Sequence, residues 1–159
     1  MPNDTVIASD RTFSAVDRKL LGRVARLIIG PDPENQLPAA DDESILTDML
    51  ERALNFERQV RGGLACLDSL AREHHQVSAD ALSDESLAHF LDSQPELRSF
   101  YRSMMQIVAQ AYYQDARVLT SLGMEARPPF PQGFHVEEGD WGLLDPVRKR
   151  APFYRNATD

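Results

Sequence analysis

Few side chains in this sequence could act as catalysts or metal ligands. The four histidines are His74, His75, His89 and His135. Cys66 is the only cysteine, so no internal disulfide can form. Glu85 and His89 are four residues apart, whereas a ferritin-like di-iron site needs repeated Glu-x-x-His motifs at three-residue spacing. The sequence has no GxSxG, GxGxxG, Walker or HExxH motif. We therefore predict no catalytic, cofactor-binding or metal-ligating residue in this chain.

The remaining reactive side chains have structural explanations. His74 and His75 close a predicted helix, where a partly charged imidazole suits the negative end of the dipole, and adjacent residues diverge instead of converging on a metal. Met104 falls on an apolar stripe, and Cys66 lies in a leucine-rich helical stretch. We expect both to pack in the core.

Length and charge narrow the class of protein. A chain of 159 residues is long enough for one domain with an appendage. Its net charge of −8 repels nucleic acid and anionic lipid, so we expect no nucleic-acid partner. No apolar run approaches the ~20 residues of a membrane span. The N-terminus has no basic and apolar export leader and no twin-arginine pair, which favours a cytoplasmic address.

Apolar residues recur at helical spacing through most of the chain, and no stretch alternates with period two, so the sequence predicts an all-α fold of about five helices. The predicted helices cover residues 14–29, 42–75, 84–92, 95–112 and 115–122. The first buried face is predicted to include Val16, Leu20, Val24, Leu27 and Ile28. The strongest stripe, within 97–112, marks the central core helix.

Helix boundaries carry their own signals. Ser14, Ser83 and Asp115 are predicted N-caps, and the acidic run 41–43 complements the dipole at the start of the second helix. The pair Gly62-Gly63 lies inside the predicted helix 42–75, which either kinks there or packs its backbone closely against a neighbour.

The composition changes at Gly123. Residues 123–159 hold five of the ten prolines and five of the twelve aromatic residues. We predict three regions: a flexible N-terminal segment at 1–12, a helical domain at 13–122, and an extended C-terminal arm at 123–159 without regular helix. The arm either folds back over the helical domain or lies on a partner. The basic run Arg148-Lys149-Arg150 either meets an acidic surface of a partner or is simply solvated.

The order of these motifs resembles the gluconate 2-dehydrogenase subunit 3 family over nearly the whole chain. The first part of the resemblance lies in Phe13-Ser14, in Leu21 and Ala25-Arg26-Leu27-Ile28-Ile29, and in Gly63-Leu64, Leu67-Asp68 and Ala71. The most specific motifs are Ala111-Tyr112-Tyr113-Gln114-Asp115, Leu122-Gly123, Arg127-Pro128-Pro129, Gly133-Phe134, Glu138-Gly139-Asp140 and Leu144-Asp145-Pro146-Val147-Arg148.

The resemblance implies a non-catalytic small subunit bound to a large FAD-containing subunit of the glucose-methanol-choline type. That large subunit oxidises a sugar or sugar acid and often passes electrons to a cytochrome subunit. Family members commonly carry a twin-arginine leader and escort the flavoprotein across the membrane. This chain has no such leader, so a periplasmic or membrane-associated complex stands as the alternative to a cytoplasmic one.

Two other functions remain open at this stage. One is a dedicated assembly or export chaperone of the flavoprotein, which differs from a subunit only in the lifetime of the complex. The other is a free-standing helical metalloprotein, which the missing ligand clusters disfavour.

The arm supplies the predicted contacts with the flavoprotein, because aromatic and arginine side chains dominate interface energetics and proline lowers the entropy lost on ordering. The predicted interface residues are Arg127, Phe130, Phe134, Trp141, Leu143, Leu144, Phe153 and Tyr154. Equally, several of them could cover the subunit's own core.

Overall fold

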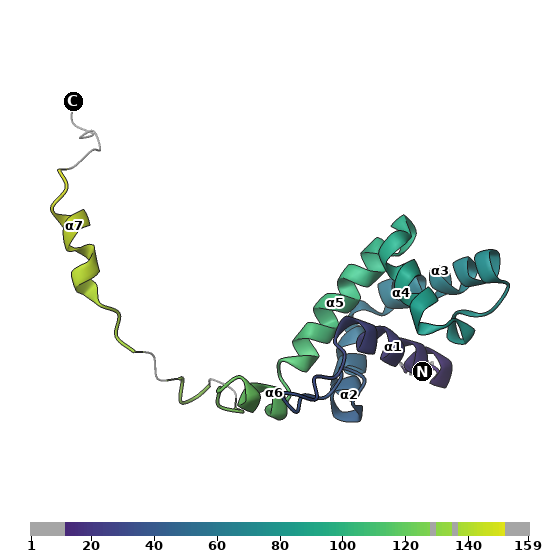
Figure 1. Ribbon diagram of the computed structural model, residues 1–159, viewed down its shortest axis with the longest axis horizontal. Helices are drawn as coiled ribbons and strands as arrows, with labels where there is room; N and C mark the ends of the chain where they lie inside the picture. Colours follow the sequence, from purple (N-terminus) through teal and green to yellow (C-terminus); the bar gives the residue numbers. More distant parts are fainter. Residues whose placement is uncertain (1–11, 128–129, 135–136, 152–159) are drawn as a thin grey trace, which may run out of the picture. The chain divides into compact units, whose positions relative to one another are not determined.

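The computed structural model describes residues 12–127, 130–134 and 137–151 (Figure 1). Within these ranges the regular elements are helices, as predicted, and one isolated bridge joins Asp32 and Leu37. The chain divides into two compact units, Met1–Arg127 and Pro128–Asp159. The predicted flexible segment 1–12 lies outside the described residues except for Thr12.

The first unit extends past the predicted end of the helical domain at residue 122. Helix α6, Ala116–Ser121, stops as predicted at Gly123, whose φ of 73° belongs to the left-handed region. Beyond this glycine the amide of Met124 donates to the carbonyl of Leu119 at 2.9 Å. The start of the predicted arm is therefore tied to α6.

Helix α1, Ala15–Ile28, begins as predicted: the Ser14 hydroxyl accepts a hydrogen bond from the amide of Asp17 at 3.1 Å. Its buried face comprises Leu20, Leu21, Gly22, Val24 and Ala25. The prediction that Val16 belongs to this face is wrong. Val16 is exposed at the rim of an open groove, one turn before α1 reaches its buried contacts.

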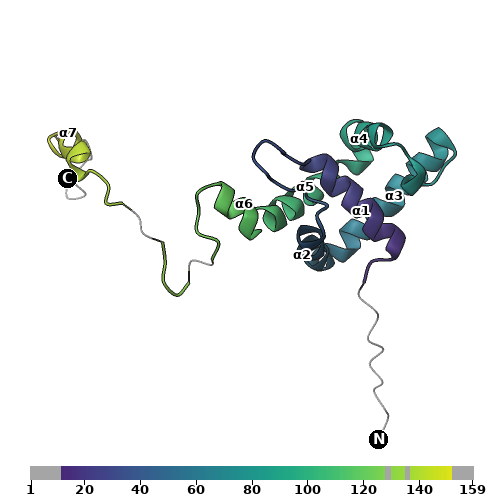
Figure 2. The same ribbon diagram turned by 60° about the horizontal axis from the view of Figure 1, so that its bottom comes forward.

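The single helix predicted over 42–75 is two helices. Helix α2, Glu43–Ala53, and helix α3, Glu57–His75, are separated by the 3₁₀ turn η1, Leu54–Phe56. Phe56 leaves helical geometry, with φ −115° and ψ 24°. Asn55 is a weak helix former, which favours the break there. Figure 2 shows α2 and α3 running in different directions.

The glycine pair lies inside α3 and does not break it. A Cβ on Gly63 would lie only 2.2 Å from the ring of Phe100, on helix α5, Arg98–Tyr112. A Cβ on Gly62 would meet nothing within 4 Å. Close packing is therefore the explanation for Gly63, because α3 and α5 approach too closely for any side chain there.

Helix α5 is the centre of the first unit, as predicted. It contacts α1, α2, α3 and helix α4, Asp84–Ser93, and these helices gather around it in Figures 1 and 2. The short 3₁₀ turns η2, Ala79–Ala81, and η3, Pro95–Leu97, lead into α4 and α5 respectively. The predicted stripe is confirmed, since the buried residues of α5 are Phe100, Met104, Ile107, Val108, Ala111 and Tyr112.

The sequence predicts structural roles for Met104, Cys66, His74 and His75, and all four lie on or near this core. Met104 is fully buried, as predicted, whereas Cys66 is only half-buried at the edge of the core. His74 and His75 occupy the last turn of α3, as predicted, and their ring centroids lie 5.7 and 5.3 Å from that of Phe90. Both imidazoles thus pack against α4.

Candidate interaction surface

The second unit contains helical structure that the arm was not expected to form. The 3₁₀ helix η4, Trp141–Leu144, continues directly into the one-turn helix α7, Asp145–Arg148. The side chain of Asp140 begins this run by accepting from the amide of Gly142 at 2.9 Å, and a proline stands in the first turn of α7. The prediction of an arm without regular helix is therefore wrong at 141–148, because a cap and a first-turn proline favour helix.

Three predicted interface residues are brought together on η4. Trp141 is 67% exposed, Leu143 74% and Leu144 42%, and Val147 on α7 is 55% exposed. Helices of four residues are too short to bury one another's apolar side chains. The second unit thus presents a local apolar surface, defined by Trp141, Leu143, Leu144 and Val147, which we call the η4–α7 surface.

The other predicted interface residues are placed separately. Phe130 and Phe134 precede η4 and are exposed. Arg127 closes the first unit, where its guanidinium pairs with Glu125. Phe153 and Tyr154 lie outside the described residues, so their role stays a prediction.

The basic run at the end of α7 is only partly neutralised. Arg148 pairs with Asp145 on the previous turn at 3.3 Å. Lys149 and Arg150 form no ion pair within the described part of the chain. Two exposed cations therefore follow the η4–α7 surface directly.

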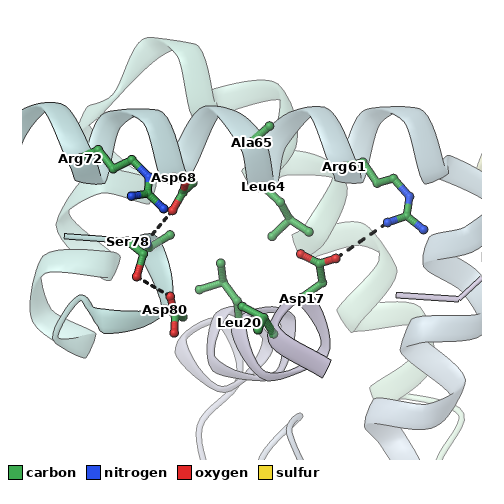
Figure 3. Close-up of a pocket in the computed structure, with 11 residues that line it drawn as sticks. Asp17, Leu20, Arg61, Leu64, Ala65, Asp68, Arg72, Ser78 and Asp80 are labelled. Atoms are coloured by element: carbon green, nitrogen blue, oxygen red, sulfur yellow. Dashed lines mark hydrogen bonds and ion pairs between the residues drawn. The ribbon is translucent and has the colours of Figure 1, made fainter. Parts of the chain in front are cut away.

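The first unit contains an open groove of about 430 Å³ between α1, α3 and η2 (Figure 3). Leu20 and Leu64 form its apolar middle. At one end Asp17 points toward Arg61, with 3.8 Å between the carboxylate and the guanidinium. The middle of the groove is thus apolar, and an ion pair lies at one of its ends.

Polar groups also close the other end of the groove. Asp68 accepts the amide of Ala79 at 3.0 Å and pairs with Arg72 at 2.7 Å. The hydrogen bond from the Ala79 amide is the main cause that lowers the pKa of Asp68, and the hydrogen bond from the Arg72 guanidinium lowers it further. The hydroxyl of Ser78 donates to Asp80 at 2.6 Å. These groups satisfy one another, so their positions are explained by the joining of η2 to α3.

A second polar cluster joins the starts of two helices. Asp42 caps α2, Asp115 caps α6, and the guanidinium of Arg117 donates to both carboxylates, at 2.8 and 2.9 Å. The hydrogen bond from Arg117 is the main cause that lowers the pKa of Asp42, to about 2, and that also lowers the pKa of Asp115. Asp115, then Asp42, raises the pKa of Arg117. We call these three residues the Arg117 clasp; it holds α6 against α2.

Neither the groove nor the Arg117 clasp was predicted from the sequence. The i,i+4 spacing of Asp68 and Arg72 was a usable signal for one ion pair. The contact between Asp42 and Arg117 had no local signal, because 75 positions separate the two residues.

Two features are absent from the described residues, a metal-binding cluster and a membrane-spanning helix. These residues contain no group of three or more His, Cys, Asp or Glu side chains placed to hold a metal ion. None of their helices combines the length and apolar character that crossing a bilayer requires. Comparison of the chain with protein-family models, curated proteins and solved structures found no match.

Proposed function

We propose that this chain is a non-catalytic small subunit of a flavin-dependent sugar or sugar-acid dehydrogenase. In this role it binds and stabilises the large FAD-containing subunit of the glucose-methanol-choline type, which carries out the oxidation. The FAD belongs to that large subunit, and a cytochrome subunit is a further member of such a complex.

One observation carries the proposal: the apolar residues of the η4–α7 surface are exposed on a chain whose core is formed elsewhere. The core consists of residues between Phe13 and Val118, all in the first unit. An exposed tryptophan beside leucine and valine side chains is typical of a surface that becomes buried on binding another protein.

The resemblance to the gluconate 2-dehydrogenase subunit 3 family supports the same partner. Two of its most specific motifs lie at η4 and α7 of the second unit. Asp140, from Glu138-Gly139-Asp140, is the cap of η4. The motif Leu144-Asp145-Pro146-Val147-Arg148 spans the junction of η4 with α7 and all of α7. The distinctive sequence therefore encodes the turn that presents the apolar residues.

The test is co-expression with a large FAD-containing dehydrogenase subunit of the glucose-methanol-choline type. The full chain should co-purify with it as a stable complex that carries flavin absorbance and oxidises a sugar or sugar acid. A chain ending after Arg127 keeps every residue of the core, so it should fold but fail to remain bound. Circular dichroism of the shortened chain checks that its helices are intact.

Two results would contradict the proposal. One is separate elution of the full chain and the flavoprotein in size-exclusion chromatography. The other is turnover of a sugar by the isolated chain, which we expect to have no oxidation activity of its own. The variant Phe56→Ala is a matched control, because Phe56 is an exposed aromatic residue of the first unit and its loss should leave the complex intact.

A further inference from the structure

The apolar residues at 141–147 follow a regular spacing. Trp141, Leu144 and Val147 recur every third residue across η4 and α7. A 3₁₀ helix has three residues per turn, and i,i+3 residues of an α-helix also neighbour each other. The three side chains therefore form one row, and all three are exposed. A row of this kind is the pattern by which short helical segments dock in apolar grooves.

Local hydrogen bonds hold the backbone of this row in shape. Besides the Asp140 cap, the amide of Leu143 donates to the Asp140 carbonyl at 3.2 Å. At the other end the amide of Lys149 donates to the carbonyl of Asp145 at 3.1 Å. Because the turn is formed before binding, less conformational entropy is lost when a partner covers the row.

The charges on either side of the row have opposite signs. Three carboxylates precede or cap it, on Glu137, Glu138 and Asp140. Lys149 and Arg150 follow it without an ion pair in the described part of the chain. The segment is therefore acidic at its N-terminal end, apolar in its middle and basic at its C-terminal end. This order of charges fixes the direction in which the segment can bind to a surface of complementary charge.

We infer that residues 137–151 bind, in one direction, in an apolar groove of the large flavoprotein subunit that is basic at one end and acidic at the other. The acidic end lies against Lys149 and Arg150, and the basic end against Glu137 and Glu138. The apolar row fills the middle, with Trp141 as its largest anchor. This inference rests on the proposed function, because it describes the surface of that same partner.

The same charges argue against two other occupants. An anionic membrane would attract Lys149 and Arg150 but repel the carboxylates at 137, 138, 140 and 145. Two copies of this chain, each with a net charge of −8, repel each other overall. A protein groove with charges of both signs satisfies both ends of the segment.

The test measures the affinity of the full chain for the purified flavoprotein subunit by biolayer interferometry. The double variant W141A/L144A should weaken binding by about 30-fold or more, because central anchors of an interface dominate its energy. The charge reversal K149E/R150E should weaken binding by about 10-fold at low salt, with a smaller effect at ~0.5 M salt, because salt screens exposed charges.

Each variant has a matched control on the first unit. Phe56→Ala removes an exposed aromatic ring, and R98E/R102E reverses two exposed cations on α5. Both controls should bind like the wild type. Circular dichroism and the unfolding midpoint verify that each variant folds.

The outcomes separate the inference from the proposed function. If the wild type does not bind the flavoprotein, the proposed function fails. If it binds and W141A/L144A and K149E/R150E bind equally well, the complex exists but the segment is not its docking element, and the inference is overturned. The inference is equally overturned if the two variants abolish dimerisation of the chain or sedimentation with anionic vesicles and leave flavoprotein binding unchanged.

Discussion

The two units use the same local signals but differ in what covers their apolar side chains. Ser14 and Asp115 cap helices of the first unit, and Asp140 caps η4 of the second. In the first unit the capped helices surround α5 and bury its apolar face. In the second unit the row from Trp141 to Val147 remains exposed. Capping thus determines where a helical turn forms, whereas burial requires a second element to cover it.

This difference separates stability from binding within one chain. The free energy of unfolding of the first unit depends on the contacts of α5 and on the clusters that join its helices. The η4–α7 surface contributes no residue to that core. The two kinds of variant should therefore act on different measurements.

The largest effects are expected where Gly63 of α3 packs against Phe100 of α5. The variant Gly63→Ala places a methyl group 2.2 Å from ring atoms of Phe100, so one helix must move, at a cost of about 2 to 3 kcal/mol in the free energy of unfolding. Urea unfolding followed by circular dichroism measures it. The neighbouring variant Gly62→Ala meets no atom within 4 Å and should stabilise α3 by up to ~1 kcal/mol. Equal stability of the two variants would contradict the close packing described for Gly63.

The next effect is expected at the Arg117 clasp. Arg117→Gln should lower the free energy of unfolding by about 1.5 kcal/mol at pH 7; the side chain is half exposed, so solvent screening keeps the loss modest. Because folding lowers the pKa of Asp42 from its ordinary 3.8 to about 2, this contribution is present above pH 3.8 and is lost as the pH falls toward 2.

Urea unfolding of both proteins between pH 7 and pH 2 measures this contribution. The difference between wild type and variant should shrink as the pH falls. A difference that stays constant down to pH 2 would show that Arg117 does not stabilise the fold through the carboxylates of Asp42 and Asp115. Arg148→Gln removes an exposed pair of the second unit and should leave unfolding of the first unit unchanged.

The sequence predicts helices well where apolar spacing and caps agree. The stripe of α5 is confirmed along its whole length, and α1 and α4 begin at the predicted Ser14 and Ser83 caps. The break at Phe56 was missed because apolar spacing continues across it, and only a weak helix former marks the site. The spacing of apolar residues predicts which residues share a helix face, but it does not predict where one helix ends and the next begins.

The helical turn of the candidate surface was missed for a related reason. Composition identified Trp141, Leu143 and Leu144 as interface residues that could equally cover the subunit's own core, but proline and glycine density concealed the helical turn on which they lie. The acidic run at 41–43 was explained by the helix dipole alone. The link from Asp42 to Arg117 depends on the tertiary fold, which no local pattern encodes.

A smaller effect is expected at Tyr112, which anchors the loop between α1 and α2 to α5. Its hydroxyl donates to the carbonyl of Pro38 at 3.1 Å. Tyr112→Phe should lower the free energy of unfolding by about 1 kcal/mol, because the carbonyl loses its side-chain donor. Tyr113→Phe is the control: that ring is more than half exposed and should change stability by less than ~0.5 kcal/mol. Indistinguishable unfolding curves for the two variants would mean that the hydroxyl does not hold the loop.

The smallest effect on stability is expected at Trp141, although it is the largest side chain that any of these variants removes. Trp141→Ala should change the free energy of unfolding by less than ~0.5 kcal/mol, because Trp141 is exposed and is not one of the core residues. Phe100→Ala in the first unit should cost about 3 kcal/mol or more, since it opens a cavity beside α3. Thermal and urea unfolding of the isolated chain compare the two directly. A destabilised Trp141→Ala protein would mean that the indole covers the subunit's own core, and the separation between a self-sufficient body and a binding segment would then fail.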